Sequence, residues 1–126
     1  MKKLLFLAED DPLMNRMYGR AFKLAGYDLT EAPDGEAAIK RLKEMNPKPD
    51  IALLDIMMPN KSGFDVLRAM KEDKDLKDIP IILLSNLSGQ EDAKKGIELG
   101  ADLFMIKSEF SPKQIIEKVE EFTSKK

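Results

Sequence analysis

The chain has 126 residues, of which 43% are apolar and 35% are charged. This length suits one domain with a hydrophobic core, and the apolar fraction is too high for a disordered tail. The lack of cysteine excludes disulfides and thiolate sites, and the lack of histidine excludes Ser-His triads and histidine zinc sites. The net charge of −2 is not the basic excess that is typical of a duplex-DNA binder.

Neither end nor middle of the chain suggests a targeting or membrane segment. The apolar start reaches an acid at Glu9, too soon for the apolar region of a signal peptide. The apolar run at residues 79–84 is far too short to span a bilayer. We therefore expect a soluble, cytoplasmic protein.

Short apolar runs alternate with amphipathic stretches along the chain. The apolar runs predict strands at residues 4–8, 27–31, 51–54, 79–84 and 103–106. Three of these runs are nearly continuous, as expected for strands that are buried on both faces of a sheet.

The stretches between the strands predict helices. The first is predicted to begin with an Asp11 N-cap and Pro12 in its first turn. Its expected inward face carries Met14, Met17, Ala21 and Leu24. A second helix is predicted to follow Asp34, and apolar residues within 64–70 mark a third.

Capping-box patterns at Ser88 and Ser111 predict the starts of a fourth and a fifth helix. Five strands that alternate with five helices predict an α/β fold with a parallel sheet covered on both faces. Ligands of such sheets bind beyond the carboxyl ends of the strands, where the strand order reverses.

Polar residues follow four of the five predicted strands. Glu9 and Asp10 follow the first strand and Asp55 the third, while Ser85 and Lys107 follow the fourth and the fifth. Because the carboxyl ends of parallel strands share one edge of the sheet, we expect these side chains to converge on one pocket. Taken alone, each has a simpler interpretation as a turn residue, a cap or a solvated side chain, and the functional interpretation depends on the set.

This set of side chains suits magnesium-assisted phosphoryl chemistry. Three neighbouring carboxylates repel one another and attract a hard cation such as Mg²⁺. The ion and Lys107 would together neutralise the three acids, so that a phosphoryl donor could approach. One carboxylate could then attack phosphorus to form an acyl phosphate, and Ser85 could hydrogen-bond a phosphoryl oxygen.

The same residues resemble a known family, the receiver domain of two-component response regulators. The matching segments are LLFLAEDDP at 4–12, PDIALLDIMMP at 49–59, IPIILLS at 79–85 and GADLFMIK at 100–107. The resemblance covers the whole chain and implies a single receiver domain over residues 1–126, similar to the chemotaxis regulators. It also implies a flavodoxin-like, doubly wound (βα)5 fold with strand order 2-1-3-4-5.

The resemblance further implies a role for each acid. Asp55 corresponds to the phospho-acceptor, and Asp10 to the direct Mg²⁺ ligand, with Glu9 acting through water. Asp55 and the backbone carbonyl of Met57 would complete the metal site, which could also take Mn²⁺. The phosphoryl donor would be a phosphohistidine on a histidine kinase or a histidine phosphotransfer protein.

The remaining roles fall on residues after the fourth and fifth strands. Ser85 corresponds to the switch hydroxyl and Lys107 to the phosphoryl contact, while Phe104 corresponds to the switch aromatic or is simply part of the core. Ser108 stands where the family usually has proline, so the preceding peptide bond is either trans with a shifted loop or cis under strain. Asn86 replaces a smaller residue and is expected to narrow the pocket.

The fourth helix is expected to be the least stable, because it contains Gly96 and has few apolar anchors, chiefly Ala93 and Ile97. A downstream protein is therefore expected to bind the face formed by residues 86–124. By the same resemblance, Met57 and Leu87 would flank the attacking water, and both are apolar, which predicts a long-lived phosphorylated form.

Two other functions fit the sequence less well. A magnesium-dependent phosphatase would have a second acid two residues after Asp55, where this chain has Met57. A flavodoxin would need a phosphate-binding loop where this chain has the acidic segment 9–12. We expect no enzyme beyond the domain's own phosphorylation and dephosphorylation, and no contact with nucleic acid or membrane. A degenerate receiver that binds proteins without being phosphorylated remains the alternative, and the chain could stand alone or belong to a longer protein.

Overall fold

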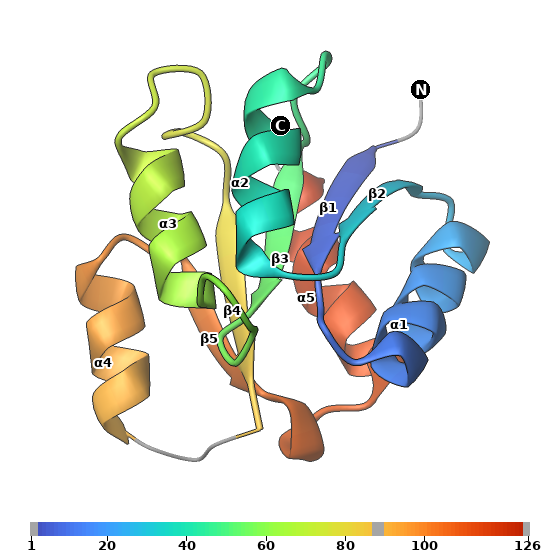
Figure 1. Ribbon diagram of the computed structural model, residues 1–126. Coiled ribbons are helices and arrows are strands. Elements are labelled where there is room, and N and C mark those ends of the chain that lie inside the picture. Colours follow the sequence, from blue (N-terminus) through green and yellow to red (C-terminus); the bar gives the residue numbers. More distant parts are fainter. Residues whose placement is uncertain (1–2, 87–89, 125–126) are drawn as a thin grey trace.

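The computed structural model describes residues 3–86 and 90–124. Five parallel strands form one sheet of order β2-β1-β3-β4-β5, with helices on both faces (Figure 1). The strands are β1 (Leu4–Ala8), β2 (Asp28–Ala32), β3 (Ile51–Asp55), β4 (Ile81–Ser85) and β5 (Leu103–Ile106). The helices are α1 (Pro12–Leu24), α2 (Gly35–Glu44), α3 (Gly63–Lys71), α4 (Gln90–Glu98) and α5 (Pro112–Thr123), with a short 3₁₀ helix η1 (Lys107–Glu109). The predicted flavodoxin-like fold and its strand order are confirmed.

Side-chain caps begin the helices where the sequence predicts them. The carboxylate of Asp11 accepts from the N–H of Leu13 at the start of α1, and Asp34 caps α2 in the same way. Ser111 and Gln114 form the predicted capping box of α5. The pattern predicted at Ser88 lies outside the described residues.

Two apolar cores lie on opposite faces of the sheet. One lies under α2, α3 and α4, and the other lies under α1 and α5 (Figure 1). Successive residues of a strand point to opposite faces, so Phe6 joins the first core while Leu5 and Leu7 join the second. Burial on both faces explains why the apolar run of β1 is continuous.

The inward face of α1 was predicted only in part: Met14 packs against the second core, but two of the other residues do not. Met17 is 40% exposed and Leu24 is 80% exposed, whereas Tyr18 and Phe22 are fully buried. The ring of Phe22 meets the ring of Tyr27 edge-on, with 5.5 Å between their centroids. The rings of Tyr18 and Phe22 belong to the second core together with Ile115 and Val119 of α5. Large aromatic rings bury more apolar surface than the smaller side chains of the predicted face.

Helix α4 approaches the sheet through a glycine. A Cβ on Gly96 would lie 2.5 Å from Cδ1 of Leu83, so the bare backbone rests on that side chain. Ile97, predicted to be an anchor, is 50% exposed instead. The ammonium of Lys95 lies 4.6 Å from the centroid of the Phe64 ring, which joins α4 to α3.

The strand bounds differ slightly from the predicted ones. β2 begins one residue later than predicted, and β4 begins at Ile81. Pro80 has no N–H to donate to a neighbouring strand, so the paired segment starts after it. In the part of the chain that is described, no helix has the length and hydropathy required to cross a membrane.

Candidate functional site

An acidic pocket of about 340 Å³ lies at the carboxyl edge of the sheet. Glu9 and Asp10 follow β1, Asp55 ends the neighbouring strand β3, and one carboxylate oxygen from each lies within 4.8 Å of the others. Glu9 and Asp55 are buried, while Asp10 is exposed. The predicted convergence of the three acids is therefore present.

Lys107 supplies a positive charge inside this pocket. Its Nζ lies 2.5 Å from Oε1 of Glu9 and 3.3 Å from Oδ2 of Asp55, and all three side chains are almost fully buried. The second oxygen of Glu9 accepts from the N–H of Asp11 at 3.2 Å. The longer side chain of glutamate, compared with aspartate, thus spans from β1 to the residue that follows β5.

The charges of the pocket act strongly on Asp55. Burial, followed by the hydrogen bond with Glu9, raises the pKa of Asp55 to about 8, and the ammonium of Lys107 opposes this rise. Burial also raises the pKa of Tyr18 to about 12, with smaller contributions from the charges of Glu9 and Asp55. Buried acids that disfavour ionisation in this way are typical of functional sites.

The donor set of the pocket fits a divalent cation. When all three acids are ionised, they and Lys107 leave two negative charges, which one divalent ion would neutralise. Carboxylate oxygens are the ligands that Mg²⁺ prefers. Within the described residues, the acids that lie close enough together to hold one ion are Glu9, Asp10 and Asp55.

Of the other predicted site residues, Met57 lines the acidic pocket, whereas Ser85 and Phe104 do not. Ser85 is fully buried at the end of β4, the strand next to β3. The N–H of Met57 donates to Oδ1 of Asp55 at 3.3 Å, and Asn86 lies exposed on the pocket wall. Phe104 is partly buried and packs against the core under α2 and α3.

Lys107 is followed by Ser108, where the receiver domains that the sequence resembles usually have proline. Within the described chain, the cis peptide bond is the one between Asn46 and Pro47. The bond between Lys107 and Ser108 is therefore trans. Both residues belong to η1, and Lys107 remains buried there. Of the two expected arrangements, the structure therefore has the trans one.

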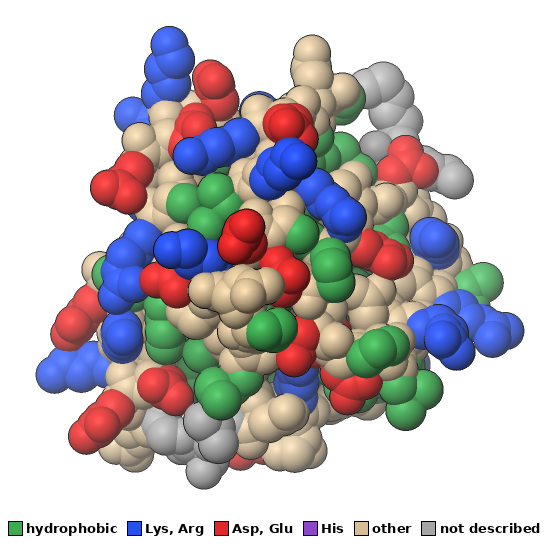
Figure 2. Space-filling model, in the orientation of Figure 1, with side chains coloured by type: hydrophobic (Ala, Val, Ile, Leu, Met, Phe, Trp, Pro, Cys, Tyr) green, Lys and Arg blue, Asp and Glu red, His purple; other side chains and the backbone are tan. Residues whose placement is uncertain are grey.

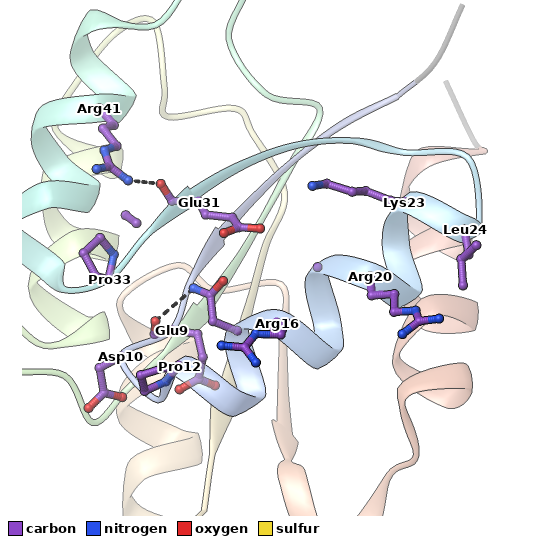
Figure 3. Close-up of a pocket in the computed structure, with 13 residues that line it drawn as sticks. Glu9, Asp10, Pro12, Arg16, Arg20, Lys23, Leu24, Glu31, Pro33 and Arg41 are labelled. Atoms are coloured by element: carbon purple, nitrogen blue, oxygen red, sulfur yellow. Dashed lines mark hydrogen bonds between the residues drawn. The ribbon is translucent and has the colours of Figure 1, made fainter.

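A groove of about 730 Å³ opens beside the acidic pocket, between α1 and the segment that joins β2 to α2 (Figure 3). Its wall carries basic side chains from α1 and α2. Those of α1 are Arg16, Arg20 and Lys23, and that of α2 is Arg41. Arg41 donates to the carbonyl of Glu31 (Figure 3). Basic side chains also gather over α1 at the right of Figure 2. This groove was not predicted from the sequence, because its residues are dispersed along the chain and only the packing of α1 beside β2 brings them together.

The comparison with protein families identifies the fold's relatives. The family model described as "Response regulator receiver domain" matches residues 5–120. The chain belongs to the receiver-domain family. The predicted resemblance is thereby confirmed, and receiver domains are signalling modules.

Curated relatives of this receiver domain are longer proteins. The "Gliding motility regulatory protein" of Myxococcus xanthus is 32% identical over 94% of this chain, which spans 15% of that protein. The "Phosphate regulon transcriptional regulatory protein PhoB" of Escherichia coli is also 32% identical over 94% of this chain, which spans 51% of that protein.

Solved structures of receiver domains have the same fold. The receiver domain of the Francisella response regulator 1452 has a TM-score of 0.88 and 27% identity, over 98% of both chains. The phosphorylated cyanobacterial phytochrome response regulator RcpA has a TM-score of 0.84 and 29% identity, over 97% of this chain and 94% of that one.

Two features of this receiver domain's site were not predicted from the sequence. One is the direct ion pair between Glu9 and Lys107, and the other is the basic groove. Leu87, predicted to flank the attacking water, lies outside the described residues. The three acids and Lys107 lie at the strand ends where the sequence predicts them.

Proposed function

We propose that this receiver domain accepts a phosphoryl group on Asp55 from the phosphohistidine of a histidine kinase or a histidine phosphotransfer protein. The observation that carries the proposal is the buried carboxylate of Asp55, within 4.8 Å of two other acids and 3.3 Å from a buried lysine. The relative RcpA, described as phosphorylated, supports it.

In the proposed reaction an oxygen of Asp55 attacks phosphorus. The new O–P bond forms as the P–N bond to the donor imidazole breaks, and the imidazole nitrogen keeps the electron pair of that bond. Mg²⁺, or Mn²⁺ in its place, supplies positive charge for the oxygens of the transferring phosphoryl group. Glu9, Asp10, Asp55 and the backbone carbonyl of Met57 would hold the ion.

Lys107 and Ser85 are assigned to the phosphoryl oxygens. Phosphorylation of Asp55 removes the carboxylate charge that the ammonium of Lys107 faces, which leaves that ammonium available for a phosphoryl oxygen. The hydroxyl of Ser85, on the strand beside β3, would hydrogen-bond another oxygen. Movement of Ser85 would then change the packing of Phe104 on β5, two strands from the acceptor.

The proposed output is a change in the surface of residues 86–124, which a downstream protein reads. Among the elements of this face, α4 is anchored least firmly to the sheet, because its buried residue is Gly96, which has no side chain to pack. We assign the whole chain, residues 1–126, to one cytoplasmic receiver domain without contacts to nucleic acid or membrane. Met57 stands where a phosphatase would need an acid, so turnover of outside substrates is not part of the proposal.

The test is incubation of the protein with acetyl phosphate and Mg²⁺, followed by intact-mass spectrometry. We expect the wild type to gain the mass of one phosphoryl group and Asp55→Asn to gain none. Asp65→Asn is the matched control, because it removes the capping carboxylate of α3 and leaves the pocket intact. A wild type that takes up no phosphoryl group, from acetyl phosphate or from a kinase, would support the unphosphorylated binding module instead.

A further inference from the structure

The loop that carries Met57 contains an unusual turn. The N–H of Lys61 donates to the carbonyl of Pro59 at 2.8 Å, and Asn60 between them has a φ of 69°. This left-handed region is unfavourable for most side chains and is tolerated best by glycine and asparagine. A non-glycine residue persists there when its surroundings hold it in place.

The carboxylate of Asp34, in the loop between β2 and α2, holds Asn60 in this conformation. Nδ2 of Asn60 donates to Oδ2 of Asp34 at 3.2 Å. The other oxygen of the same carboxylate, Oδ1, accepts from the N–H of Ala37 at 2.8 Å and caps α2. Asp34 thus fastens the loop after β3 to the first turn of α2.

The two loops also meet backbone against backbone. A Cβ on Gly35 would lie 1.9 Å from the carbonyl oxygen of Lys61, so only glycine permits this approach. The far end of the loop is closed in the same manner, because a Cβ on Gly63 would lie 2.4 Å from the carbonyl oxygen of Asp55. The N–H of Gly63 donates to the carbonyl of Ile56 at 3.0 Å.

These contacts fix the chain on both sides of Met57. Its N–H is held by Asp55, and three residues later Asn60 is held by Asp34. A peptide carbonyl that is held in one orientation binds an ion more tightly than one that must first be ordered. The hydrogen bond from Asn60 to Asp34 joins this loop to the start of α2 through side chains, beside the backbone contact between Gly35 and Lys61.

We propose that Asp34 is a positioning residue for the metal site, acting through Asn60 on the loop that presents the Met57 carbonyl. Asp34 reaches neither the ion nor the phosphoryl group in this scheme, since its two oxygens are engaged with α2 and Asn60. The inference depends on the proposed function, because it assumes that Met57 is a metal ligand.

Two substitutions remove the contact from opposite sides. Asn60→Gly deletes the side-chain amide, keeps the charge of the protein and suits the positive φ. Asp34→Ser keeps a hydroxyl that can cap α2 and removes the oxygen that Asn60 reaches. Asp73→Ser is the control, since it also removes a loop carboxylate that accepts from a nearby N–H, at the opposite edge of the sheet.

Mg²⁺ binding to each folded variant is measured by calorimetric titration below the melting temperatures. We expect each substitution to weaken binding about tenfold, as is typical of residues that orient metal ligands. The double variant should bind no more weakly than the weaker single variant, because both changes remove the same hydrogen bond. Asp73→Ser should bind like the wild type.

Amide hydrogen exchange of the metal-free proteins provides a second readout. Exchange at Met57 and Met58 should accelerate in Asn60→Gly, with no change in the amides of α2. Equal Mg²⁺ affinity in all variants, or additive losses in the double variant, would overturn the positioning role and leave the proposed function intact. A wild type that binds no Mg²⁺ would overturn both, whatever the exchange rates.

Discussion

Lys107 supplies the positive charge that offsets the carboxylates of the acidic pocket. A buried ammonium is costly unless it is paired, and here Nζ lies within 3.3 Å of both Glu9 and Asp55. The same lysine keeps two buried carboxylates from facing each other uncompensated. Its removal should therefore matter most when no divalent ion is present.

We predict that Lys107→Met lowers the unfolding free energy of the metal-free protein by about 3 kcal/mol, because it leaves two buried acids without a counter-charge. Saturating Mg²⁺ should recover much of this loss, since the ion neutralises the same acids. Urea denaturation with and without Mg²⁺ measures both effects.

Lys118→Met is the matched control for this prediction. Nζ of Lys118 lies 3.4 Å from a carboxylate oxygen of Glu121, but both side chains are about half exposed. Exposed pairs of this kind contribute less than about 1 kcal/mol. Losses of equal size in the two variants, or a loss that is insensitive to Mg²⁺, would show that Lys107 is not the counter-charge.

Among the elements, the strands follow from the sequence more closely than the helix faces do. β1 and β5 have the predicted bounds, because a continuous apolar run leaves few other choices. The inward face of α1 does not follow, since Met17 and Tyr18 lie on helical stripes of similar apolar character. Packing against α5, which local periodicity does not contain, decides between the two stripes.

We predict that Gly96→Ala destabilises the protein by about 1–2 kcal/mol, even though alanine is the better helix former. The new methyl group would lie 2.5 Å from Cδ1 of Leu83, which is fully buried and has little room to move. Thermal unfolding followed by circular dichroism measures the change.

Lys94→Ala, at an exposed position of the same helix, is the control and should change stability little. A gain of about 1 kcal/mol in Gly96→Ala would match helix propensity alone. That result would mean that α4 does not rest on Leu83.

At the scale of the whole molecule, the candidate site was predictable because parallel topology brings the strand ends to one edge. Glu9, Asp55 and Lys107 lie at or directly after the ends of three different strands, and Nζ of Lys107 is within 3.3 Å of an oxygen of each acid. The contact between Asp34 and Asn60 was not predictable. It depends on a positive φ and on two loops meeting, which no spacing along the chain reveals.

The switch proposed for residues 86–124 predicts a response on one side of the molecule. Beryllofluoride, a phosphoryl mimic, should change amide exchange in α4 and β5, because α4 is held to the sheet through Gly96 and Leu83. Amides of α2 in the same experiment are the internal reference. Unchanged protection in α4 and β5 would contradict an output surface there.

The ion pair between Glu9 and Lys107 joins positions that are 98 residues apart. A nascent polypeptide that has not yet added β5 therefore lacks the ammonium that makes its acids tolerable. Competence to receive a signal would then arise late in synthesis and all at once. A partly synthesised or partly unfolded copy would lack the complete pocket.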